Sequence, residues 1–150
     1  MNIADILRHK SAEPTHGSAV LTIGPDETVT TLLSTLAEHN VGALVVVGAS
    51  SDSDVAGIVS ERDVVRRLAE RGAEMLEATV SQIMSTDVVS CSSKDKVDSI
   101  AETMTERRIR HMPVIDDGEL IGVVSIGDVV SSKIRQLETD RGQLEQYIVG

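Results

Sequence analysis

Residues 57–65 read GIVSERDVV, and residues 122–130 read GVVSIGDVV. The two stretches agree at the glycine, the valine before the serine, the serine, the aspartate and both final valines, at an offset of 65 residues. Recurrence of so restricted a pattern indicates that one supersecondary unit is present twice. We call each stretch a signature, and the two units the first and the second copy.

The duplication extends upstream of the signature. At an offset of 68, Thr35 and Glu38 recur as Thr103 and Glu106, inside apolar patterns with the i, i+3, i+4, i+7 spacing of an amphipathic helix. The apolar runs that follow, 43–47 with 55–59 and 112–115 with 120–124, predict one β-hairpin in each copy. A second helix is expected after each signature, the first of them ending at Gly72.

A related lead-in precedes each copy, and residues 3–7 match residues 80–84 at an offset of 77. Residues 8–19, with Pro14 and Gly17, predict a polar loop that lengthens the first lead-in. The candidate helix caps are Asp26 or Thr28 in the first copy and Ser93 or Asp95 in the second. Pro113 is expected at the edge or the start of a strand, because it has no N–H for a ladder.

The predicted fold class is α+β, with two βαββα repeats that each carry a three-stranded sheet and pack face to face with pseudo-twofold symmetry. One copy of roughly 60 residues would barely be stable alone, so the pair should form one body with two related clefts. The expected divisions are residues 1–72, residues 73–136 and a helical tail, 137–150. The tail's sparse apolar stripe fits either packing on its own domain or a dimer contact.

Composition limits the classes of partner. The chain has 24 acidic and 14 basic residues, a net charge of −10, and neither Trp nor Phe, which argues against binding to nucleic acid. No apolar run approaches a membrane span and no signal peptide is evident, so we expect a cytoplasmic protein. The single Cys91 excludes an internal disulfide, and the histidines lack metal-ligand spacing, so no metal site is expected.

The signature has two chemical interpretations. Where a strand turns into a helix, backbone N–H groups and the helix dipole attract an anion, so Ser60 and Ser125 could bind a phosphate while Asp63 and Asp128 accept ribose hydroxyls. Alternatively, Ser-x-x-Asp is a helix capping box that needs no ligand.

The duplicated signature, the stretch 110–114 (RHMPV) and the second lead-in, 80–91, together resemble a pair of CBS domains, the tandem called a Bateman module. The resemblance covers nearly the whole chain. It implies that an adenosine compound such as AMP, ADP, ATP, NAD(H) or S-adenosylmethionine binds in clefts between the copies. AMP is the first candidate, as a regulatory ligand, and no cofactor is required.

Carried over by position, the resemblance implies that Asp63 and Asp128 bind the ribose and that Ser60 and Ser125 lie beside the phosphate. The implied adenine pocket is lined by Thr22, Ala43, Leu44, Val45, Ser90, His111, Met112 and Pro113. The cations differ between the copies, because Gly127 stands where the first copy has Arg62. The candidate phosphate-binding cations are Arg62 and Arg66 in the first copy and Arg108, Arg110 and Lys133 in the second. We therefore expect unequal sites, although each cation also fits a solvated helix face.

The leading hypothesis is a non-catalytic energy-sensing module that signals ligand occupancy to a protein partner, which the sequence does not name. The chain lacks the glycine-rich and nucleophile motifs of enzymes, so no catalytic activity is expected. CBS pairs commonly associate as homodimers, and a homodimer is expected here. The alternative hypothesis is a ligand-free interaction protein that acts through homodimerisation.

Overall fold

The computed structural model describes residues 1–12, 20–48 and 54–149, and it confirms an α+β fold with two repeats. The chain forms two compact units, which we describe one at a time. Unit 1 comprises Met1–Ser18, Cys91–Met112 and Val124–Gly150, and unit 2 comprises Ala19–Ser90 and Pro113–Val123.

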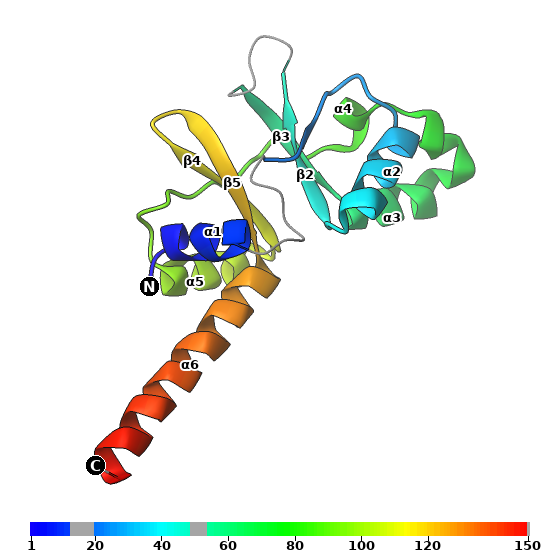
Figure 1. Ribbon diagram of the computed structural model, residues 1–150. Helices are drawn as coiled ribbons and strands as arrows, with labels where there is room; N and C mark the ends of the chain where they lie inside the picture. The colour runs from blue at the N-terminus through cyan, green and yellow to red at the C-terminus, as the bar shows by residue number, and fades with distance from the viewer. Residues whose placement is uncertain (13–19, 49–53, 150) are drawn as a thin grey trace. The chain divides into compact units, whose positions relative to one another are not determined.

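Unit 2 contains a three-stranded sheet with the order β1-β2-β3, of which Figure 1 labels β2 and β3. The short strand β1 (Thr22–Ile23) is parallel to β2 (Ala43–Val47), which pairs antiparallel with β3 (Val55–Ser60). Two helices, α2 (Val29–His39) and α3 (Glu61–Arg71), pack on this sheet. The core consists of Ile23, Val29, Leu32, Leu36, Leu44, Val46, Val59, Val64, Met75, Val80 and Ile83.

The second lead-in packs on the first copy. It follows α3, which ends at Gly72 as predicted, and the 3-10 helix η1 (Gly72–Glu77), and it forms the short helix α4 (Val80–Ile83). Val80 N–H donates to Glu27 O over 2.8 Å, and Ser85 exchanges two backbone hydrogen bonds with Ile58 over 2.9 and 3.0 Å. This lead-in therefore pairs with the strand that carries the first signature.

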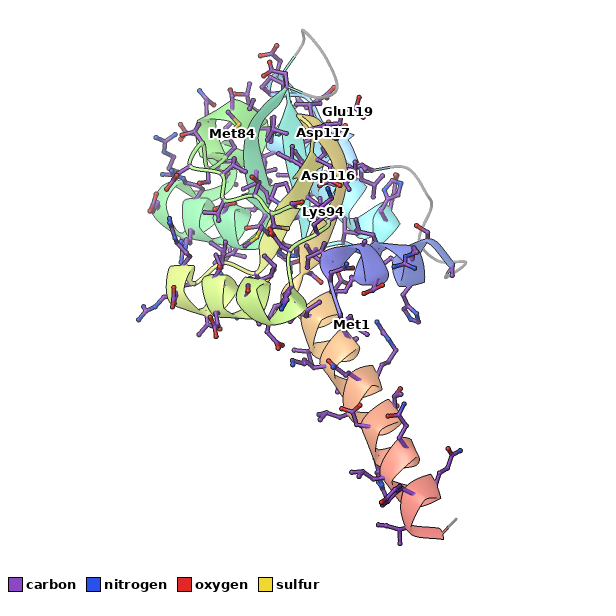
Figure 2. All side chains as sticks on the ribbon, turned by 90° about the vertical axis from the view of Figure 1, so that its left-hand side faces the viewer. Met1, Met84, Lys94, Asp116, Asp117 and Glu119 are labelled. Carbon is purple, nitrogen blue, oxygen red and sulfur yellow. The ribbon has the colours of Figure 1, made fainter. Side chains whose placement is uncertain are left out.

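The first lead-in packs on the second copy, inside unit 1. The start of helix α1 (Ile3–Ala12) meets the segment that leads into α5 (Val97–Arg107), where Ile3 N–H donates to Asp95 O over 2.9 Å. Met1 lies at the first turns of α6 (Ile126–Val149), where the Ser132 hydroxyl contacts its sulfur (Figure 2). The two lead-ins are thus exchanged between the copies.

The second hairpin pairs β4 (His111–Asp116) with β5 (Glu119–Ser125) through a two-residue turn (Figure 2). Asp117 and Gly118 have φ angles of 50° and 80°, as a type I′ turn requires at both central positions. No third strand joins this sheet in the described residues, contrary to the prediction of three strands. Pro113 holds the position of Val45, the residue that pairs with Thr22 in the first copy, and a proline cannot donate a ladder hydrogen bond.

Two local predictions were wrong. Residues 8–12 were predicted to lie in a loop but belong to α1, because no helix breaker precedes Pro14. Pro14 and Gly17 lie outside the described residues. Thr28 caps α2 as predicted, but α5 begins after Lys96 without a side-chain cap. The carbonyls of Ser93 and Asp95 instead accept the first N–H groups of α1.

Helix α6 is 24 residues long and runs on without a break through Gly142. Its first turns bury Val129 and Ser132 within unit 1, whereas its last turns extend away from α1 and α5 (Figure 1). None of the helices in the described ranges is both long enough and apolar enough to span a bilayer.

Candidate functional site

The first signature lies where β3 ends at Ser60 and α3 begins at Glu61. Asp63 Oδ2 accepts the Ser60 N–H over 2.8 Å and the Ser60 hydroxyl over 3.0 Å, while Asp63 N–H donates to Ser60 Oγ over 3.4 Å. This reciprocal pair is a capping box. The first signature therefore forms a capping box at the start of α3.

The second signature repeats this geometry with one additional partner. Asp128 Oδ2 accepts the Ser125 N–H over 2.8 Å, and Asp128 N–H donates to Ser125 Oγ over 3.1 Å. The same oxygen lies 3.0 Å from Nζ of Lys10 on α1. Lys10 was not among the predicted site residues, because it lies in the segment 8–19 that was predicted to be a polar loop, whereas it belongs to α1.

The capping hydrogen bonds use only one of the two oxygens of each aspartate carboxylate. Within the described ranges, all hydrogen bonds of the Asp63 and Asp128 side chains involve Oδ2, and Oδ1 has no partner. A carboxylate can accept several hydrogen bonds, so Oδ1 could accept a hydroxyl of a ligand while Oδ2 holds the helix start. A helix cap and a ribose acceptor are therefore compatible roles for one side chain.

Each helix start is also tied to the segment that enters the hairpin. Glu61 N–H donates to Gly42 O over 3.0 Å, and Ile126 N–H donates to Arg110 O over 2.8 Å. These bonds bring the segments predicted to line the adenine pocket next to the signatures. They also use N–H groups of the first helical turn, so fewer backbone donors remain for an anion than the sequence suggested.

Most of the residues predicted to line the adenine pocket are buried or half-buried. Ala43, Leu44 and Val45 are 7%, 1% and 0% exposed, and Leu44 belongs to the core. Side chains alternate along a strand, so Ala43 and Val45 face away from that core. Met112 and Pro113 are buried, His111 is half-buried, Thr22 pairs with Val45, and Ser90 is exposed.

A family model described as the CBS domain matches residues 15–70 and 80–134. The chain belongs to the CBS-domain family. Each matched range contains one signature, so the capping boxes at Ser60 and Ser125 belong to the two CBS copies.

Individual relatives extend this result. The CBS domain-containing protein CBSX3, mitochondrial, of Arabidopsis thaliana is 36% identical over 150 residues, which cover 99% of this chain and 72% of that protein. The crystal structure of the CBS-domain containing protein ATU1752 from Agrobacterium tumefaciens has a TM-score of 0.80 and 39% identity, and the match covers 88% and 92% of the two chains. The CBS domain pair of protein MJ0100 has a TM-score of 0.74 at 23% identity, covering 91% of this chain and 98% of that one. That crystal structure is a complex with 5′-methylthioadenosine and S-adenosyl-L-methionine.

The predicted phosphate-binding cations lie in different environments. In the first CBS copy Arg62 is half-buried and Arg66 is exposed. In the second copy Arg110 is exposed, and the Lys133 ammonium pairs with Asp98 on α5. The hydrogen bond and the charge of Lys133 lower the pKa of the Asp98 carboxyl, so this pair stabilises the fold above the ordinary carboxyl pKa and stops doing so as the pH falls through the lowered value.

Arg108 lies in a strained position of the second CBS copy. It follows α5 with a φ of 54°, the left-handed conformation that non-glycine residues avoid, and its N–H donates to Met104 O. Asn40, the equivalent residue at an offset of 68, ends α2 in the same way with a φ of 50°. Asparagine tolerates this conformation better than arginine does.

We expect Arg108→Gly to raise the free energy of unfolding by about 1 kcal/mol, because glycine removes the strain of the left-handed residue. Urea denaturation measures the effect. Arg107→Gly, which removes the same charge from the last helical residue, should lower the free energy by about 1 kcal/mol. Equal effects of the two substitutions would contradict the assignment of strain to Arg108.

Proposed function

We propose that this CBS pair is a non-catalytic regulatory module that binds an adenosine-containing ligand at each signature and signals its occupancy to a protein partner. The observation that carries the proposal is the duplicated capping box whose Asp63 and Asp128 each keep one free carboxylate oxygen among the described residues. The hairpin entry is hydrogen-bonded beside each box. The proposal assigns the ribose to these aspartates and the adenine to the hairpin entries.

The structural neighbour MJ0100 supports an adenosine ligand, because its CBS pair is described in complex with two such compounds. AMP is the first candidate here, and ADP, ATP, NAD(H) and S-adenosylmethionine are the others. Two further points stay predictions: the copies face each other across two clefts, and the protein acts in the cytoplasm.

Titration calorimetry with AMP, ATP, NADH and S-adenosylmethionine tests the proposal. We expect at least one of them to bind, with a matching rise in melting temperature. If none of these compounds binds or shifts the melting temperature at millimolar concentration, the sensor hypothesis fails. The hypothesis of a ligand-free interaction protein is then the better one.

A second copy of this chain is the proposed partner of α6. The exposed large apolar residues of α6 include Val130, Ile134, Leu137, Leu144 and Ile148. They follow the alternating four- and three-residue steps of a heptad seam, with Arg141 at the one remaining position. A single polar residue in such a seam favours one register and one oligomeric state, so we propose a homodimer formed along α6.

Leu137→Glu and Leu144→Glu should each convert the homodimer to monomer, because a carboxylate would be buried in the seam. Sedimentation equilibrium measures the mass. Thr139→Glu adds the same charge at an exposed position outside the seam and should leave the dimer intact. A dimer that survives both leucine substitutions would show that α6 is not the interface.

A further inference from the structure

Lys10 reaches the second signature from 118 residues away in the sequence. Its side chain and that of Asp128 are 29% and 20% exposed, so the ion pair is partly shielded from water. Helix α1 is anchored to the second copy by the buried Ile3 and Ile6 and by the hydrogen bond from Ile3 N–H to Asp95 O. A well-anchored helix therefore delivers this cation to Asp128.

The Lys10 contact changes the role of the serine hydroxyl. In the first copy the Ser60 hydroxyl donates to Asp63 Oδ2 over 3.0 Å. In the second copy Lys10 donates to Asp128 Oδ2 instead, and within the described part of the chain the Ser125 hydroxyl donates to no acceptor. The Ser125 O–H can therefore donate to a ligand, whereas the Ser60 O–H is already used.

We propose that Lys10 and Ser125 together make the second signature selective for an adenosine ligand with an anionic 5′ substituent, such as a phosphate monoester. A lysine ammonium has three N–H donors, so it can hold Asp128 and a phosphate oxygen together. Lys10 thereby supplies the cation that the second signature lacks at Gly127. At the first signature the Ser60 hydroxyl already donates to Asp63, so it has no spare donor for a phosphate.

This inference rests on the proposed function, and the 150-residue chain is used to test it. With the first site disabled by Asp63→Asn, the Kd of AMP and of adenosine are measured by calorimetry. Lys10→Met should weaken AMP about tenfold, the effect of losing one charge-assisted hydrogen bond, and change adenosine less than about twofold. Lys10→Arg should restore most of the AMP affinity.

Two matched controls isolate the contact. Arg8→Met removes the same charge from α1 at an exposed residue that pairs with Asp5, and it should leave the affinity for AMP unchanged. Ser125→Ala in the Asp63→Asn background should reduce the preference for AMP over adenosine, whereas Ser60→Ala in an Asp128→Asn background should not.

Equal losses of AMP and adenosine affinity in Lys10→Met, or equal effects of Lys10→Met and Arg8→Met, would overturn the inference. In both cases the sensor function would stand. A wild-type chain that binds neither ligand would instead refute the proposed function, and this inference with it.

Discussion

Replacing Asp63 and Asp128 together by asparagine should abolish the binding of adenosine ligands while both helices stay capped. In each box the asparagine amide oxygen can replace Oδ2 as the acceptor of the serine N–H. The amide nitrogen then replaces Oδ1, and a nitrogen donor cannot accept a ribose hydroxyl. The substitution thus separates the cap from the ligand acceptor.

The expected loss is large enough for thermal denaturation. A ligand present at about a hundred times its Kd should add about 2.7 kcal/mol to the stability of the wild-type chain. For a chain of this length that corresponds to a rise of roughly 2 to 4 °C in Tm for each kcal/mol. The double asparagine variant should show no rise. Without ligand it should lose about 0.3 to 1 kcal/mol for each charge removed from a helix start, and up to about 1 kcal/mol more for the Lys10–Asp128 ion pair.

The alanine pair, Asp63→Ala with Asp128→Ala, is the matched control. It removes the acceptor of the serine N–H together with the ribose acceptor, and leaves only the bond from the N–H of residue 63 or 128 to the serine hydroxyl. It should therefore lose the same binding and a further amount of about 1 kcal/mol for each helix. If the asparagine variant binds the ligand as tightly as wild type does, the assignment of the ribose to these aspartates is wrong.

Gly57→Ala should destabilise the fold by about 2 to 3 kcal/mol, the upper part of the range for overpacking. A Cβ at residue 57 would lie 2.7 Å from Ser85 O and 2.8 Å from Met84 Sδ. Relief of that clash requires the second lead-in to move away from β3, which would strain the two hydrogen bonds between Ile58 and Ser85. The glycine of the first signature is therefore explained by close backbone packing.

Gly127→Ala is the control in the second signature, and urea denaturation of both variants measures the difference. Gly127 lies in the first turn of α6, where an added Cβ comes no closer than 3.6 Å to Ser125 Oγ. Alanine is favoured over glycine in a helix, so this variant should gain about 0.5 to 1 kcal/mol. Equal losses in the two variants would show that the contact with Ser85 is not the cause.

Local pattern predicted most of the secondary structure. The strand β2 was predicted with its observed bounds, and Gly72 was predicted as the residue that ends α3. These elements have strong local determinants: a continuous run of branched apolar residues and a glycine that can adopt a positive φ. A third strand was wrongly predicted beside β4, because strand pairing depends on a neighbour that is distant in the sequence.

The contacts made by the two signatures were predicted in the same uneven way. The duplicated signature identified Ser60 with Asp63 and Ser125 with Asp128, because a capping box is a contact within four residues of one chain segment. Lys10 was not identified, because its contact with Asp128 joins residues far apart in the sequence. The ion pair between the predicted cation Lys133 and Asp98 on α5 was not foreseen either, because it also joins distant residues.

The sequence alone therefore determined that the chain is a duplication, where most helices and hairpin strands of each copy lie, and that each signature forms a capping box. These features depend on hydrophobic period, turn residues and contacts over three or four residues. Only the tertiary structure decided that the lead-ins are exchanged, which gives Asp128 a cation from α1 and sets Ser85 against Gly57. Such pairings form when distant segments bury their apolar faces together, and no local pattern in the chain records which segments will meet.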